Sequence, residues 1–162
     1  MNKTQDKVVK MVAIDLDGTL LQSDHTLAER TIEAIRHVSS LGVVVCIATG
    51  RSTKSVASYL RVLDLPMSCP CVTFNGTCGV WLGSNEKDDK QVFVDPLSDE
   101  DTRDLIAFSQ RQGLVAQYYN AMTSEIQAVP TTDEHRELMG QYAGLVGTLQ
   151  IEPESYAAAL SK

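Results

Sequence analysis

The sequence predicts an α/β fold, a partial doubly wound parallel sheet followed by a smaller α+β region. Three observations support this prediction. Apolar runs of strand length alternate with helical apolar patterns over residues 8–75, polar turns separate these segments, and shorter, more polar segments follow Asn75 and Gly76. The 162 residues, of which 43% are hydrophobic, suffice for one ordinary core with a small appendage.

The predicted strands of the first region cover residues 8–14, 43–48 and 71–74. The first is almost continuously apolar, as expected of a parallel strand that is covered on both faces. Strands and helices alternating at this spacing imply right-handed crossovers and a parallel sheet. Sites in such sheets lie at the carboxyl ends of the strands, so the residues that follow each strand are the candidates for function.

Two predicted helices connect these strands. Thr26 and Glu29 form a capping box that opens the first helix, and Gly42 is placed to end it. The predicted buried face of this helix carries Ile32, Ile35, Val38 and Leu41. The second helix buries Val56, Leu60 and Leu63 and ends before Pro66.

The second region begins beyond a hairpin pattern. Residues 78–82 and 91–94 are predicted to pair around a charged loop, and we set the domain boundary after residue 82, which gives domains 1–82 and 83–162. Ser98 with Asp101 caps a helix, and residues 115–119 and 125–129 form paired strands. A helix from Thr131, a short strand over 148–151 and a helix from Pro153 complete the region. The helix from Thr131 is predicted to carry Leu138, Met139, Tyr142 and Leu145 on one face.

Charge and cysteine content restrict the classes of function. The formal charge of -7 opposes binding to nucleic acid or to an anionic membrane surface. No apolar stretch reaches the length of a signal peptide or a membrane span, so we expect a cytoplasmic protein with four reduced cysteines. Cys69 and Cys71 are interpreted as core thiols, because no second Cys or His pair lies at metal-ligand spacing. His25, His37 and His135 are predicted to have surface or capping roles.

Two carboxylates follow the first predicted strand, and a hydroxyl and a guanidinium follow the second. Asp15 could attack phosphorus to form an acyl phosphate, and Asp17 could protonate the leaving oxygen and later accept a proton from water. Thr49 and Gly50 offer a hydroxyl and backbone N–H groups to an anion, and Arg51 adds positive charge. These groups together predict phosphoryl transfer.

Asp15-Leu16-Asp17-Gly18-Thr19-Leu20-Leu21 and Ala48-Thr49-Gly50-Arg51 resemble the motifs of the haloacid dehalogenase-like hydrolases, and Thr73-Phe74-Asn75-Gly76 favours the Cof-type sugar phosphatase branch. The resemblance implies a C2-type cap, Mg²⁺ as cofactor and a small phosphorylated metabolite as substrate. It makes Asp15 the nucleophile and a metal ligand, and Asp17 the acid/base and a ligand through its carbonyl. It places Thr49 at the phosphoryl group and Asn75 near the substrate. Leu16, Gly50 and Arg51 are further candidates for binding phosphate or substrate.

The resembled family also has a lysine after the cap and an acidic Gly-Asp-x-x-Asn-Asp motif, and neither is found in this sequence. We therefore expect weak metal binding by this chain alone, and a bare sheet edge that promotes self-association. Whether Lys162 is a biological end or the end of a truncated gene model stays open. The alternatives to an active phosphatase are a non-catalytic remnant or interaction module, and a receiver-type phosphoacceptor.

Overall fold

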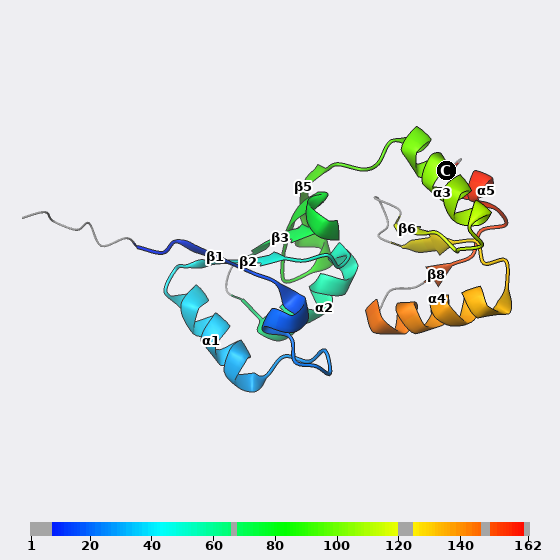
Figure 1. The fold of residues 1–162 in the computed structure, drawn as a ribbon. Coiled ribbons are helices and arrows are strands. Elements are labelled where there is room, and N and C mark those ends of the chain that lie inside the picture. Colours follow the sequence, from blue (N-terminus) through cyan, green and yellow to red (C-terminus); the bar gives the residue numbers. More distant parts are fainter. Residues whose placement is uncertain (1–7, 66–67, 120–124, 147–149, 161–162) are drawn as a thin grey trace, which may run out of the picture. The chain divides into compact units, whose positions relative to one another are not determined.

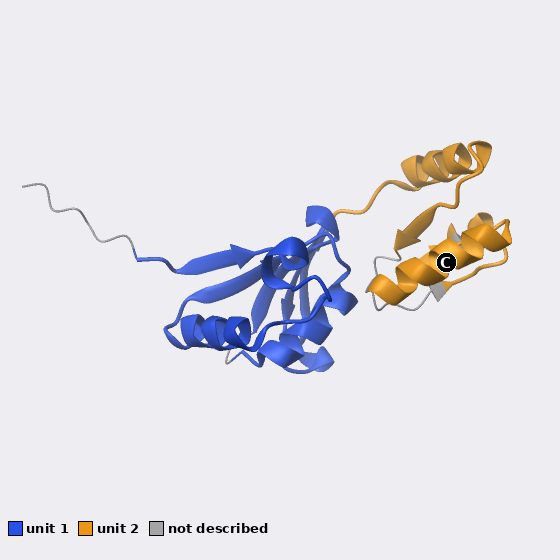
Figure 2. Cartoon of the chain, turned by 60° about the horizontal axis from the view of Figure 1, so that its bottom comes forward, with its two compact units in different colours: residues 1–94 blue, residues 95–162 orange. Residues whose placement is uncertain are grey.

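The computed structural model describes residues 8–65, 68–119, 125–146 and 150–160. The chain divides into two compact units, residues 1–94 and 95–162, which are coloured separately in Figure 2. Within the described residues, none of the helices has the length and apolar character that crossing a membrane requires.

The first unit is built on a five-stranded sheet whose strands follow one another in sequence order (Figure 1). These strands are β1 (Met11–Ile14), β2 (Val44–Ala48), β3 (Cys69–Thr73), β4 (Cys78–Leu82) and β5 (Lys90–Val94). β1, β2 and β3 are parallel, because helices α1 (Glu29–Ser40) and α2 (Thr53–Leu63) return the chain between them. β4 and β5 add an antiparallel hairpin. The predicted α/β class is confirmed.

The core of this unit forms where the apolar face of α2 meets the sheet. Val56 and Leu63 of α2 are fully buried and Leu60 nearly so, as their helical spacing predicts. Ile47, in the second of the five strands, is also fully buried in this cluster. Burying each of these side chains stabilises the fold by about 1.5–3 kcal/mol. The core therefore fixes β2 and the start of α2, the two elements that flank Thr49, Gly50 and Arg51.

The two helices of this unit begin differently. Ser52 caps α2, since its hydroxyl accepts the N–H of Ser55 at 3.3 Å. The capping box predicted for α1 is wrong, because Thr26 donates both its N–H and its hydroxyl to Asp24 Oδ1, at 3.0 and 2.7 Å. α1 consequently starts at Glu29 without a side-chain cap. Leu41, predicted to be buried, caps the C-terminus of α1 and is 68% exposed.

β1 is the outermost strand in the sheet order, with β2 beside it. The bare edge expected at this strand is present, because no strand among the described residues lies on its other side. The predicted coverage of both its faces is wrong, because Met11 and Ala13 on one face are exposed. Met11 is 53% exposed, and Val8 and Val9 just before the strand are 77% and 65% exposed. An apolar groove runs beside β1, lined by Val12 and by α1 residues such as Val38. An unpaired edge with apolar flanks favours pairing with another chain.

The second unit has α+β organisation. Its elements are α3 (Asp99–Arg111), β6 (Gln117–Tyr119), β7 (Ile126–Ala128), α4 (Asp133–Val146), β8 (Gln150–Ile151) and α5 (Tyr156–Leu160). β6 pairs with β7 in antiparallel fashion, and β7 pairs with β8 in parallel. The predicted Ser98 cap of α3 is confirmed, because the Ser98 hydroxyl accepts the N–H of Asp101 at 3.0 Å.

The apolar stripe predicted for α4 is wrong in large part. Met139 is 1% exposed, but Leu138 and Leu145 are 52% and 60% exposed. Leu138, Tyr142 and Leu145 share one side of the helix, which is exposed, and Met139 lies about a quarter of a turn away on the buried side.

The two units divide between Val94 and Asp95, twelve residues beyond the boundary set from the sequence. The reason is that β5 pairs with β4 from Cys78 to Trp81, which makes the hairpin part of the first sheet. That the residues beyond the hairpin form a cap domain stays a prediction.

Candidate functional site

The loop after β1 carries the two candidate carboxylates. The N–H of Leu20 donates to the Asp15 carbonyl at 3.2 Å, and the N–H of Leu21 donates to the Leu16 carbonyl at 2.9 Å, so the chain closes into one wide turn. Gly18 has a φ of +73°, a conformation that glycine adopts without a steric penalty. The side chain of Leu16 is fully buried and anchors the loop, while Asp15 and Asp17 are exposed.

The loops after β2 and β3 are joined by backbone hydrogen bonds. The N–H of Asn75 donates to the Thr49 carbonyl at 3.3 Å, and the N–H of Phe74 donates to the Arg51 carbonyl at 3.0 Å. Phe74 and Asn75 have positive φ angles of 52° and 56°, which bend the chain back sharply after β3. Asn75 also lies against Gly50, where a Cβ would be 2.6 Å from Asn75 Oδ1. A glycine is therefore needed at position 50 if Asn75 keeps this orientation.

Arg51 connects the β2 loop to the β1 loop. Its Nε donates to Asp17 Oδ2 at 2.7 Å and its Nη2 donates to Asp17 Oδ1 at 2.6 Å. Such a two-point contact between a guanidinium and a carboxylate fixes the orientation of both groups. The backbone N–H of Arg51 donates to the hydroxyl of Thr49 at 3.2 Å, and Thr49 is 8% exposed. The predicted residues Asp17, Thr49, Gly50, Arg51 and Asn75 thus gather at one end of the sheet.

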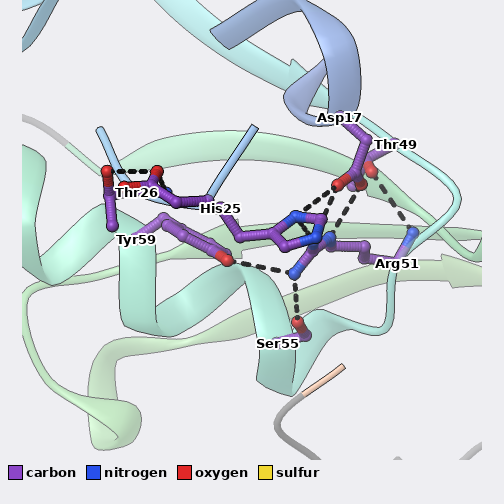
Figure 3. Close-up of polar contacts among 8 residues, drawn as sticks. Asp17, His25, Thr26, Thr49, Arg51, Ser55 and Tyr59 are labelled. Carbon is purple, nitrogen blue, oxygen red and sulfur yellow. Dashed lines mark hydrogen bonds and ion pairs between the residues drawn. The ribbon is translucent and has the colours of Figure 1, made fainter. Parts of the chain in front are cut away.

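Three residues that were not predicted complete this cluster. Figure 3 shows the His25 ring pointing toward the Arg51 guanidinium, with Nη2 and His25 Nδ1 3.1 Å apart. From α2, the Tyr59 hydroxyl accepts from Arg51 Nη1 at 3.1 Å, and the Ser55 hydroxyl lies 3.4 Å from the same nitrogen. Ser55 and Tyr59 follow Arg51 by four and eight residues, a helical spacing that could have indicated them.

The surface or capping role that the sequence predicts for His25 does not include this contact, and no spacing in the sequence indicates it. It lies in the loop before α1 with a φ of 60°, a backbone conformation that is uncommon for histidine. This conformation directs its ring to the site, where Nδ1 is 3.5 Å from Asp17 Oδ1.

The contact with Arg51 also determines the charge of Asp17. Hydrogen bonds from the Arg51 guanidinium lower the pKa of Asp17, and the positive charge of Arg51 acts in the same direction against the effect of desolvation. The pKa of Arg51 is raised, chiefly by the same hydrogen bonds. Asp17 is therefore an ionised carboxylate at neutral pH in this arrangement.

The environment of Asp15 differs from that of Asp17. Among the described residues, none forms a hydrogen bond or an ion pair with the Asp15 carboxylate. Asp15 is exposed, so its carboxylate is open to solvent and to a ligand. Leu16, predicted to bind phosphate or substrate, has only its backbone available, because its side chain is in the core. The two aspartates therefore have the unequal environments that separate chemical roles require.

The residues available for a metal ion are oxygen donors, as Mg²⁺ prefers. The Asp15 carboxylate and the carbonyl of Asp17 are adjacent in the β1 loop, and they fit part of such a coordination sphere. No group of three or more His, Cys, Asp or Glu residues in the described part of the chain could hold a metal ion. All four cysteines are free and buried.

The chain is similar to known phosphatases in sequence and in fold. The sequence pattern of the haloacid dehalogenase-like hydrolase family matches residues 12–142. The 5-amino-6-(5-phospho-D-ribitylamino)uracil phosphatase of Bacillus subtilis is 42% identical over 66 residues, which make up 41% of this chain and 24% of that protein.

Two solved structures extend the similarity. A haloacid dehalogenase-like hydrolase from Bacteroides thetaiotaomicron matches 93% of this chain and 53% of its own length, with a TM-score of 0.77 and 20% identity. A subclass IIB sugar phosphatase of the same superfamily matches 95% of this chain and 55% of its own, with a TM-score of 0.71 and 21% identity. The chain thus spans about half the length of these structures and about a quarter of the length of the Bacillus subtilis phosphatase.

Proposed function

The chain belongs to the haloacid dehalogenase-like hydrolase family, and from this membership we propose that it carries the nucleophile half of a Mg²⁺-dependent phosphomonoesterase. The proposed substrates are sugar phosphates or similar small phosphorylated metabolites. The names of the relatives support this class, since one acts on a phosphorylated ribitylaminouracil and another is a sugar phosphatase. Action in the cytoplasm is part of the proposal and is supported by the four free thiols.

The observation that carries the proposal is the difference between the two aspartates of the β1 loop. Asp15 is exposed, and no described residue pairs with it, so its carboxylate oxygen is available to attack phosphorus. In that step the bond from Asp15 to phosphorus forms, the bond from phosphorus to the ester oxygen breaks, and its electron pair leaves with that oxygen. The leaving oxygen takes a proton from Asp17.

In the second step a water oxygen attacks the phosphoryl group on Asp15, the bond between Asp15 and phosphorus breaks, and Asp17 accepts the proton of the water. The carboxylate form of Asp17, which Arg51 stabilises, is the form that this second step needs. For the first step Asp17 must be protonated, which weakens its contact with Arg51. The Arg51 contact thus favours hydrolysis of the acyl phosphate over its formation.

The phosphoryl group is proposed to bind between the β1 and β2 loops. The Thr49 hydroxyl and the backbone N–H groups of Leu16 and Gly50 would hold its oxygens. Asn75, which contacts Gly50, would lie beside the rest of the substrate. Mg²⁺ would be held by the Asp15 carboxylate and the Asp17 carbonyl, where it would neutralise the charge of the phosphoryl group.

The test is phosphate release by the purified chain from a panel of small phosphomonoesters, with Mg²⁺ and with a chelator. We expect release that requires Mg²⁺ and is lost in Asp15→Asn, and a hydroxylamine-sensitive acyl phosphate on Asp15. Asp64→Asn is the control, because Asp64 lies in the turn that ends α2. If no ester in the panel yields phosphate, catalysis by this chain is excluded.

A second candidate function is a catalytically incomplete remnant that acts as an interaction module. It is favoured by the exposed edge at β1 and by the finding that the described residues contain no group of three metal-binding side chains. This alternative predicts no phosphate release together with association of the chain, either with itself or with another protein.

A further inference from the structure

We propose that Arg51 is a positioning residue that fixes the carboxylate of Asp17, and that Tyr59, Ser55 and His25 hold its guanidinium in place. The inference rests on the proposed function, in which Asp17 transfers the proton. It differs from the role predicted for Arg51 from its charge and position in the sequence, which is contact with phosphate or substrate.

The donors of Arg51 can be accounted for one by one. A guanidinium has five N–H donors and no acceptor. Nε and Nη2 each donate to an oxygen of Asp17, and His25 Nδ1 lies 3.1 Å from Nη2. Nη1 donates to the hydroxyls of Tyr59 and Ser55, at 3.1 and 3.4 Å. All three nitrogens of the guanidinium therefore have partners within the first unit, and a phosphate would have to displace or share one of them.

His25 lies beside both Arg51 and Asp17. Its Nδ1 lies 3.1 Å from Arg51 Nη2 and 3.5 Å from Asp17 Oδ1, so the ring contacts both members of the pair.

The Arg51 side chain is more buried than the Asp17 carboxylate that it contacts. The Arg51 side chain is 9% exposed, whereas that of Asp17 is 45% exposed. The Tyr59 ring lies under the guanidinium, with its centroid 5.4 Å from Cζ, and Tyr59 packs against the core of the first unit. A side chain anchored on a helix in this way holds its partner more precisely than a loop residue could. Side chains of α2 thus hold Arg51 in place, and Arg51 in turn holds the Asp17 carboxylate.

This arrangement separates two roles for Arg51 that make different predictions. A phosphate ligand must change its contacts when phosphate binds, and its loss weakens the binding of every phosphoester. A positioning residue keeps its contacts when phosphate binds, and its loss slows the steps in which Asp17 moves a proton.

The first experiment does not depend on catalysis. The ¹⁵N NMR signal of Arg51 Nε, assigned through Arg51→Lys, reports solvent exchange of Nε–H and rotation of the guanidinium. We expect slow exchange and slow rotation compared with Arg61, which is 55% exposed, and both should stay slow when inorganic phosphate is added. Tyr59→Phe removes one acceptor and keeps the ring, so rotation should become faster, whereas Tyr142→Phe in the second unit should change nothing. An Arg51 signal as mobile as that of Arg61, or exchange and rotation rates that change when phosphate is added, would overturn the proposal.

The second experiment compares two substrates in the full chain. p-Nitrophenyl phosphate has a good leaving group that needs little protonation, whereas glycerol phosphate has a poor one that needs an acid. In Tyr59→Phe we expect kcat for glycerol phosphate to fall about tenfold with KM nearly constant, because general acid catalysis typically contributes a factor of about 100 or more. The fall should be smaller for p-nitrophenyl phosphate. An equal rise in KM for both esters would instead assign Arg51 to phosphate binding.

The two experiments separate the inference from the function on which it rests. If the wild-type chain releases no phosphate from either ester, the proposed function fails. The NMR measurement still supports or overturns the contact between Arg51 and Asp17 in that case, because it needs no turnover.

Discussion

The pairing of Asp17 with Arg51 predicts a measurable coupling in the stability of the first unit. The change is a double-mutant cycle of Asp17→Ala, Arg51→Ala and the two together. Alanine is used at both positions because lysine at position 51 or asparagine at position 17 would keep part of the contact. The two hydrogen bonds of 2.6 and 2.7 Å are charge-assisted and two-pronged, a geometry worth about 1.5–3 kcal/mol when buried. Asp17 is 45% exposed, however, and exposed ion pairs contribute about 0.2–1 kcal/mol. We therefore expect a coupling free energy of about 1 kcal/mol.

The assay is urea unfolding followed by tryptophan fluorescence. Trp81 is the single tryptophan of the chain and lies on β4, so its signal reports the unfolding of the first unit. The pair of Arg61 and Glu86 is the control, since its contact is 3.1 Å but its side chains are 55% and 81% exposed. A coupling of about 0–0.5 kcal/mol is expected for that pair.

The coupling should also depend on pH. Because Arg51 lowers the pKa of Asp17 in the folded state, the stabilisation is complete above the ordinary aspartate pKa of about 3.9 and is lost as the pH falls through the lowered value. A cycle measured at pH 7 should therefore give a larger coupling than a cycle measured at the lowest pH at which the unit stays folded. A coupling at pH 7 no larger than that of Arg61 and Glu86, or one that does not change with pH, would refute this reasoning.

Three further predictions concern the sheet and its loops. Ile47→Ala should destabilise the first unit by about 2–5 kcal/mol in urea unfolding, because Ile47 is fully buried; a loss below about 1 kcal/mol would contradict this packing. Gly50→Ala should leave stability within about 0.5 kcal/mol but turn the exposed Asn75 side chain away, since its Oδ1 would be 2.6 Å from the new Cβ; a crystal structure with Asn75 unmoved would disprove this. Met11→Lys should reduce self-association in sedimentation velocity more than Val62→Lys on α2, and a wild-type chain that is monomeric at high concentration would exclude the β1 edge as an interface.

The apolar spacing of the sequence predicted best those elements of the first unit that bury a continuous face, such as α2. Val56, Leu60 and Leu63 recur at helical spacing, and all three lie in the core. Errors occurred where a short-range hydrogen bond or a missing neighbour decided the outcome. Thr26 bonds to Asp24 instead of capping α1, and Met11 and Ala13 of β1 lie on a face that the described residues leave exposed.

The site could be predicted as far as chain topology determines it. Parallel strands bring their carboxyl ends to one edge, so the loops that carry Asp17, Thr49 and Asn75 were expected to meet there. Which side chain would face Arg51 was not predictable, because that depends on rotamers and on the positive φ of His25. Sequence spacing contains no information about such a backbone conformation.

The two hydrogen bonds between the β2 and β3 loops couple the movements of these loops. The carbonyls of Thr49 and Arg51 accept the N–H groups of Asn75 and Phe74, so a shift of the loop proposed to bind phosphate also moves the tight turn that leads into β4. Occupancy by a ligand would in this way be transmitted along the hairpin, and amide hydrogen exchange in β4 and β5 should slow when inorganic phosphate is added.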